Sequence, residues 1–156
     1  FIITYAYYTL MFSILLVISV YDLRNKIIPD NLSLVFGVLA FIGLFFFLDF
    51  NFSLHIPDLF QFLSGFIIAL PLGLMWLLSR GAWMGFGDVK LSLGLGWLLG
   101  LSGAFWGLLF SFWSGAIIGI LLVAFTKKYG IKSEIPFAPF LVLGTFLAFI
   151  FSLHIF

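Results

Sequence analysis

The chain has 156 residues, of which 64% are hydrophobic and only 8% are charged, and its mean hydropathy is +1.30. Soluble globular domains are about half apolar and about a quarter charged, so this composition excludes that class and favours a polytopic membrane protein. Cysteine is absent and the formal net charge is +1. The absence of cysteine excludes disulfides and thiolate metal sites. A net charge this close to zero gives none of the basic character that is typical of nucleic-acid-binding proteins.

Six apolar stretches divide the chain, and a helix needs about 20 such residues to cross a bilayer. They cover residues 2–21, 32–48, 59–79, 87–102, 104–126 and 138–156. We therefore expect an all-α membrane protein with about six transmembrane helices, forming a single transmembrane domain over residues 1–156. In the fourth stretch, the uncharged residues that follow Lys90 are too few to cross a bilayer by themselves. We therefore expect residues 85–88 to lie below the membrane surface and to line an aqueous site.

Basic residues occur only in the first, third and fifth of the polar segments between these stretches. The positive-inside rule assigns such segments to the cytoplasm. Both termini are therefore predicted to lie outside, and Asp22 and Asp88 on the cytoplasmic side. The basic residues are Arg24, Lys26, Arg80, Lys90, Lys127, Lys128 and Lys132.

Two acids, Asp22 and Asp88, stand at the ends of apolar stretches. An ionised carboxylate is costly near hydrocarbon, so acids placed in this way are candidates for function. Two neighbouring carboxyl groups share a proton; the ionised group can deprotonate a water while the protonated group donates to a carbonyl, as in aspartic proteases. The alternative is a structural role, in which the acids form ion pairs with Arg24, Lys26 or Lys90 at the membrane interface.

Several residues near the acids can be explained by a structural role. Gly85 and Gly87 allow positive φ and close backbone approach, which would let an extended peptide lie against Asp88, but they also suit a plain flexible loop. Pro136 suits the start of the last helix. Asp30 is expected to cap the second helix.

Three motifs, taken in order, resemble those of the type IV prepilin peptidase family, the GxGD-type intramembrane aspartyl proteases. Residues 21–30 (YDLRNKIIPD) resemble the first aspartate motif of that family, and residues 84–91 (MGFGDVKL) resemble its G-x-G-D-x-K signature. Residues 134–141 (EIPFAPFL) are similar to its late Pro-Phe-x-Pro-Phe element. The resemblance extends over essentially the whole chain.

This resemblance implies an aspartic-type endopeptidase that needs no metal or cofactor. Such enzymes remove the basic leader peptide from type IV prepilins or pseudopilins at the cytoplasmic face of the prokaryotic inner membrane. The resemblance implies a catalytic pair and a substrate-binding set. The pair is Asp22 and Asp88, and the set is Gly85, Gly87, Lys90 and Pro136.

Longer members of the family carry an N-terminal cytosolic segment with a zinc-binding cysteine set and an amino-methyltransferase activity. Neither a cysteine nor such a segment is found in this sequence. We therefore expect only the peptidase part. A naturally short member and a truncated copy of a bifunctional protein both remain open.

Two other functions fit parts of the sequence. A small proton- or cation-coupled transporter would use Asp22 and Asp88 as a relay. Such a protein should carry polar groups through to the outer face, yet no charged residue lies between Lys90 and Lys127. A non-enzymatic scaffold would use the small residues at every fourth position from Gly103 to Gly119 for helix packing, but it has no need for paired acids.

Overall fold

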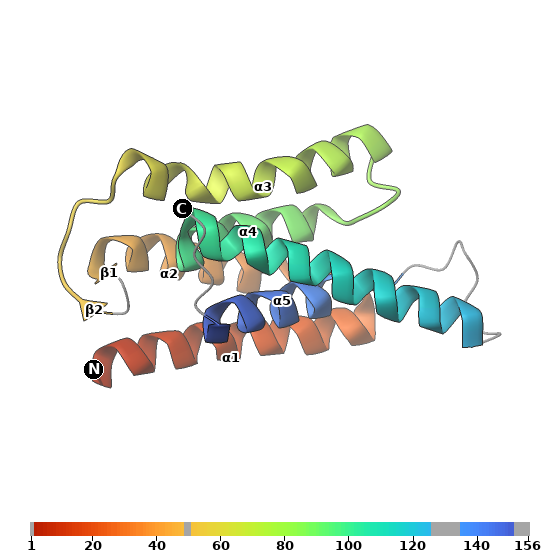
Figure 1. The fold of residues 1–156 in the computed structure, drawn as a ribbon, viewed down its shortest axis with the longest axis horizontal. Helices are drawn as coiled ribbons and strands as arrows, with labels where there is room; N and C mark the ends of the chain where they lie inside the picture. Colours follow the sequence, from red (N-terminus) through yellow and green to blue (C-terminus); the bar gives the residue numbers. More distant parts are fainter. Residues whose placement is uncertain (1, 49–50, 126–134, 152–156) are drawn as a thin grey trace.

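The computed structural model describes residues 2–48, 51–125 and 135–151. Five helices account for most of them, and they lie side by side in an elongated bundle (Figure 1). The helices are α1 (Ile2–Asn25), α2 (Asp30–Phe46), α3 (Leu59–Ser79), α4 (Phe86–Phe125) and α5 (Ala138–Phe151). The strands in the described ranges are two residues each, β1 (Phe47–Leu48) and β2 (Asn51–Phe52), and they pair antiparallel. Apart from this short hairpin, the all-α prediction is confirmed.

Helix α4 contains a break at Gly100, whose φ of 71° and ψ of 177° are not helical. Glycine adopts such a positive φ readily because it has no Cβ. The chain reverses direction at this point, so that α4 consists of two segments, 86–99 and 101–125 (Figure 1). These segments correspond to the predicted fourth and fifth apolar stretches, but the turn lies at residue 100 and not, as the sequence suggested, at residues 101–103.

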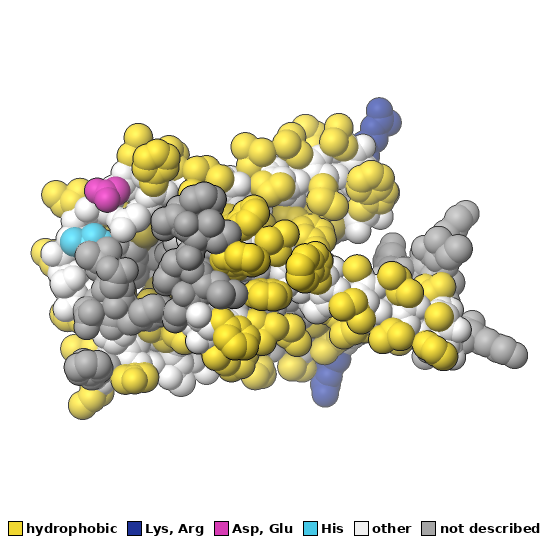
Figure 2. Space-filling model, in the orientation of Figure 1, with side chains coloured by type: hydrophobic (Ala, Val, Ile, Leu, Met, Phe, Trp, Pro, Cys, Tyr) yellow, Lys and Arg dark blue, Asp and Glu magenta, His cyan; other side chains and the backbone are white. Residues whose placement is uncertain are grey.

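Three helices, α1, α3 and α4, are long and apolar enough to cross a membrane, whereas α2 and α5 are shorter apolar helices. Hydrophobic side chains cover most of the face seen in Figure 2, and the visible Lys and Arg side chains lie toward the end where α1 and α3 finish. These features indicate an integral membrane protein. The number of six transmembrane helices and the outward termini stay predictions, and Lys127, Lys128 and Lys132 lie outside the described residues.

Small residues allow α4 to touch its neighbours at backbone distance. A Cβ added to Gly96 would lie 2.6 Å from the carbonyl oxygen of Ser64 in α3, whose hydroxyl donates to the Gly96 carbonyl at 2.8 Å. In the second segment of α4, Gly107 and Ser111 pack directly against Gly144 of α5. The prediction that the small-residue positions of this segment serve helix packing is therefore confirmed at Gly107 and Ser111.

Candidate active site

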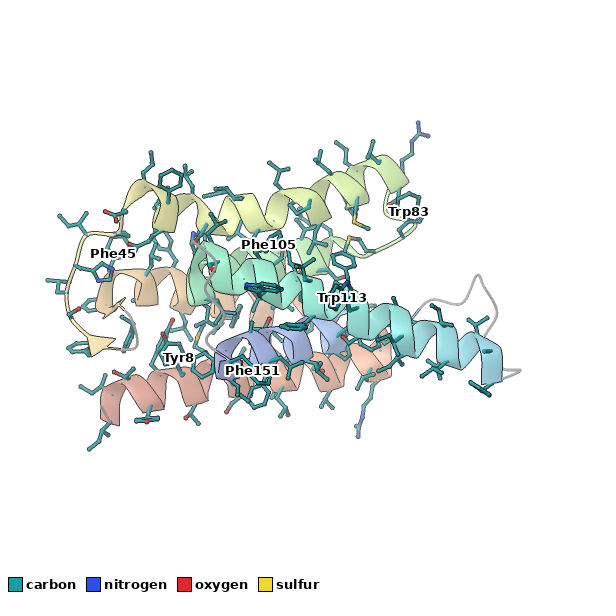
Figure 3. All side chains as sticks on the ribbon, in the orientation of Figure 1. Tyr8, Phe45, Trp83, Phe105, Trp113 and Phe151 are labelled. Carbon is teal, nitrogen blue, oxygen red and sulfur yellow. The ribbon has the colours of Figure 1, made fainter. Side chains whose placement is uncertain are left out.

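A cavity of about 400 Å³ opens at the end of the bundle where α1 ends and α4 and α5 begin. Three stretches of chain form its wall: the end of α1 with the turn into α2, the α3–α4 loop with the start of α4, and the residues that lead into α5. Trp83, which also lines the cavity, marks this end in Figure 3. All of the residues singled out from the sequence as a site line this cavity: Asp22, Gly85, Gly87, Asp88, Lys90 and Pro136.

Asp22 lies in the last turn of α1 and is only 4% exposed. Its Oδ2 accepts a hydrogen bond of 3.2 Å from the backbone N–H of Ala138, the first residue of α5. The first amides of a helix have no partner within that helix. Asp22 therefore caps α5 from a different helix, and this bond fixes the end of α1 against the start of α5.

Asp88 lies in the first turn of α4 and is 6% exposed. Its Oδ1 has no hydrogen-bond partner among the described residues, whereas its backbone N–H bonds to the Gly85 carbonyl at 3.3 Å. Asp22 lines the same cavity as Asp88. Buried polar atoms are nearly always hydrogen-bonded, so this unpartnered oxygen sets Asp88 apart from a side chain that is buried for structural reasons.

The two glycines before Asp88 serve different purposes. Neither has the positive φ that the sequence allowed; in this loop Gly81 takes that conformation, with φ of 79°. A Cβ on Gly87 would lie 2.8 Å from the Cβ of Ile28, in the turn before α2, so Gly87 is required by close packing. A Cβ on Gly85 would have no neighbour nearer than 3.9 Å. The alternative of a plain flexible loop does not hold for Gly87, because α4 begins at Phe86.

Lys90 pairs with Asp30 rather than with Asp22 or Asp88. Its Nζ lies 2.8 Å from Asp30 Oδ1 and 5.3 Å from the centre of the Phe86 ring. This is the one ion pair within the described residues, so the alternative of two interfacial acids held by basic residues does not describe this structure. The predicted capping role of Asp30 is wrong as well: Pro29 is the N-cap, and Asp30 lies one position inside α2, where Lys90 binds its carboxylate.

Two contacts of the site were not indicated by the sequence. Ala138 contributes only its backbone N–H, so its side-chain type carries no signal, although the neighbouring Pro139 does mark a helix start. Ile28 matters because its Cβ occupies the space beside Gly87. Among the described residues, no three His, Cys, Asp or Glu side chains cluster closely enough to hold a metal ion.

Comparison with known proteins assigns the chain to a family. Residues 9–121 match the profile of the type IV leader peptidase family, and this range contains Asp22 and Asp88. The chain belongs to the type IV leader peptidase family. The resemblance noted in the sequence is thus confirmed.

One curated relative is a prepilin leader peptidase/N-methyltransferase from Xanthomonas campestris pv. campestris. It is 31% identical over 139 residues, which cover 86% of this chain and 46% of that protein. The chain therefore spans about half the length of this relative. No solved structure gives a significant match.

Proposed function

We propose that this protein is a membrane-embedded aspartic-type endopeptidase that removes the basic leader peptide from type IV prepilins or pseudopilins. The observation that carries the proposal is the convergence of two buried acids, Asp22 of α1 and Asp88 of α4, on one cavity. Family membership supports peptidase activity. The printed name of the Xanthomonas relative supports prepilins as the substrate class.

The chemistry follows from the proton that the two acids share. The ionised carboxylate removes a proton from a water molecule, and the water oxygen attacks the carbonyl carbon of the scissile peptide bond. The protonated carboxyl group donates its proton to the carbonyl oxygen, and the proton taken from water then passes to the leaving amine. Neither carboxyl group is engaged by a cation among the described residues, so both are available for proton exchange.

The same cavity supports a cytoplasmic active site. Lys26 and Lys90 line it, and Arg24 lies in the last turn of α1 beside it. Basic residues that flank membrane spans are retained on the cytoplasmic side. The proposal therefore places cleavage at the cytoplasmic face of a prokaryotic inner membrane, where the basic leader of the substrate lies.

Cleavage of a defined substrate tests this function. The purified chain, reconstituted in lipid, is incubated with a leader-bearing prepilin, and the products are weighed by mass spectrometry. We expect the mass of the substrate to fall by the mass of its leader, and we expect Asp88→Asn to abolish this loss.

The matched control is Asp58→Asn. Asp58 is an acid that caps the start of α3, at the opposite end of the bundle from the cavity (Figure 1), and asparagine caps a helix about as well as aspartate. This variant should cleave like the wild type. Folded wild-type protein that leaves the prepilin intact, or cleavage by Asp88→Asn at close to the wild-type rate, would contradict the proposal.

A further inference from the structure

A second hollow, of about 510 Å³, lies between α2 and the first segment of α4. We call it the α2–α4 groove. Its apolar walls are formed by Leu34, Val38 and Phe41 of α2 and by Leu93 and Trp97 of α4.

The groove is continuous with the candidate active site. Asp30 and Lys90, the residues of the ion pair, line both the groove and the catalytic cavity. A chain that leaves the groove at this end passes the ion pair and enters the cavity that holds Asp22 and Asp88. The groove and the acids therefore form one continuous surface.

Two residues of α2 that line the groove, Gly37 and Ser33, leave space or hydrogen-bonding capacity unused. A Cβ added to Gly37 would have no neighbour within 4 Å, whereas one added to Gly43 of the same helix would overlap the ring of Tyr7. Ser33 is only 3% exposed, and its Oγ has no hydrogen-bond partner among the described residues. Gly37 thus keeps space open on the groove side, and Ser33 contributes a buried, unpartnered hydroxyl one helical turn from Asp30.

We propose that the α2–α4 groove binds the apolar membrane-embedded segment of the peptide substrate, directly beside the bond that is cleaved. The proposal rests on the peptidase function stated above. The apolar walls take the side chains along one face of a substrate helix. The chain then becomes extended at the Asp30–Lys90 end, where it reaches the two acids.

The unpartnered hydroxyl favours a peptide over the hydrocarbon tail of a lipid as the occupant. A hydrocarbon tail can neither donate nor accept a hydrogen bond, so it would leave the Ser33 hydroxyl unsatisfied. The substrate helix follows the leader, so its first N–H groups lie at the cavity end; they lack an intrahelical partner, and the Ser33 oxygen can accept a bond from one of them. The position of Ser33 near the cavity end matches the place where the substrate helix has to begin.

A larger side chain at Gly37 tests the proposal. Gly37→Phe fills the groove without meeting protein atoms at its Cβ. Two substrates are compared: a prepilin with its apolar segment, and a soluble peptide that covers the leader and the cleavage site only. We expect the KM for the full substrate to rise about 10- to 100-fold, the change expected when one large apolar side chain is no longer buried, while the KM for the short peptide stays the same.

The matched control is Val35→Phe, which places the same side chain on α2 at a residue that is 45% exposed and lies outside the groove. It should leave both KM values unchanged. A second readout does not depend on cleavage: a photoreactive benzophenone residue replacing Val38 should cross-link to the full substrate, and the same residue replacing Val35 should not.

The outcomes separate the two proposals. Wild-type protein that cleaves neither substrate overturns the peptidase function itself. If the wild type cleaves the full substrate and Gly37→Phe leaves its KM unchanged, the groove proposal alone is overturned and the groove is left to a lipid chain. An equal loss on both substrates also overturns it, because the effect then arises in the catalytic cavity.

Discussion

Replacement of Gly87 by alanine is expected to lower kcat about 10- to 100-fold while the protein stays folded. The new Cβ would lie 2.8 Å from the Cβ of Ile28, and ordinary contact begins at 3.4 Å. The Ile28 Cβ is attached directly to the backbone, so no rotamer change can move it away. The start of α4, which carries Asp88, must therefore move away from the turn before α2. The movement is about 0.6 Å, the difference between 2.8 Å and the 3.4 Å of ordinary contact.

The size of the effect follows from how strongly catalysis depends on geometry. A misplacement of about 1 Å can cost about 100-fold in rate, so a shift of about 0.6 Å is expected to cost somewhat less. The effect on folding is smaller. Overpacking costs about 1–3 kcal/mol, and the better helix propensity of alanine offsets up to about 1 kcal/mol of it.

The neighbouring variant Gly85→Ala is the matched control, because its Cβ would have no neighbour nearer than 3.9 Å. Its kcat should stay within about threefold of the wild type, since Asp88 does not have to move. The assay is prepilin cleavage under saturating substrate, with thermal unfolding of each variant in the same lipid. Equal losses of kcat for the two variants, both folded, would refute the packing argument.

Three further predictions follow from the same structure. The rate of cleavage should show a bell-shaped pH dependence, because one acid must be ionised and the other protonated; a rate that only rises with pH would exclude a shared proton. Gly96→Ala should lower the free energy of unfolding by about 1–3 kcal/mol, since its Cβ would lie 2.6 Å from backbone atoms of α3. Gly37→Ala should not lower it, since its Cβ would have no neighbour within 4 Å. Equal unfolding temperatures for these two variants would contradict the close approach of α3 and α4. Asp30→Asn removes the ion pair with Lys90, but both side chains are substantially exposed, so chemical unfolding should report a loss below about 1 kcal/mol.

The lengths and bounds of the apolar stretches were sufficient to predict where the helices lie. Apolar stretches bounded by polar residues predicted each helical segment, including the two halves of α4, because a membrane-spanning helix needs a long unbroken apolar run. The turn in α4 was predicted at residues 101–103 and lies at Gly100. Residues 99–103 contain glycine at 100 and at 103, and local sequence does not say which of the two takes the positive φ.

The candidate site was predicted in its residues but not in its contacts. The ordered motifs indicated Asp22 and Asp88, and both line the cavity. The bond from Ala138 to Asp22 joins residues 116 positions apart, and the pair of Lys90 and Asp30 joins residues 60 positions apart. Such partners are set by how the helices pack, so Asp30 was assigned to its own helix end and Lys90 to the substrate-binding set.

The central claim is that the two acids work as one unit, and a double-variant comparison tests it most directly. Asparagine keeps the shape of aspartate, and at position 22 it can still accept the bond from Ala138. We predict that Asp22→Asn and Asp88→Asn each lower kcat for prepilin cleavage about 10²- to 10⁴-fold. The double variant should be no slower than the slower single variant, because a pair that has lost one member is already inactive. Near-wild-type cleavage by either single variant, or losses that multiply in the double variant, would contradict the account.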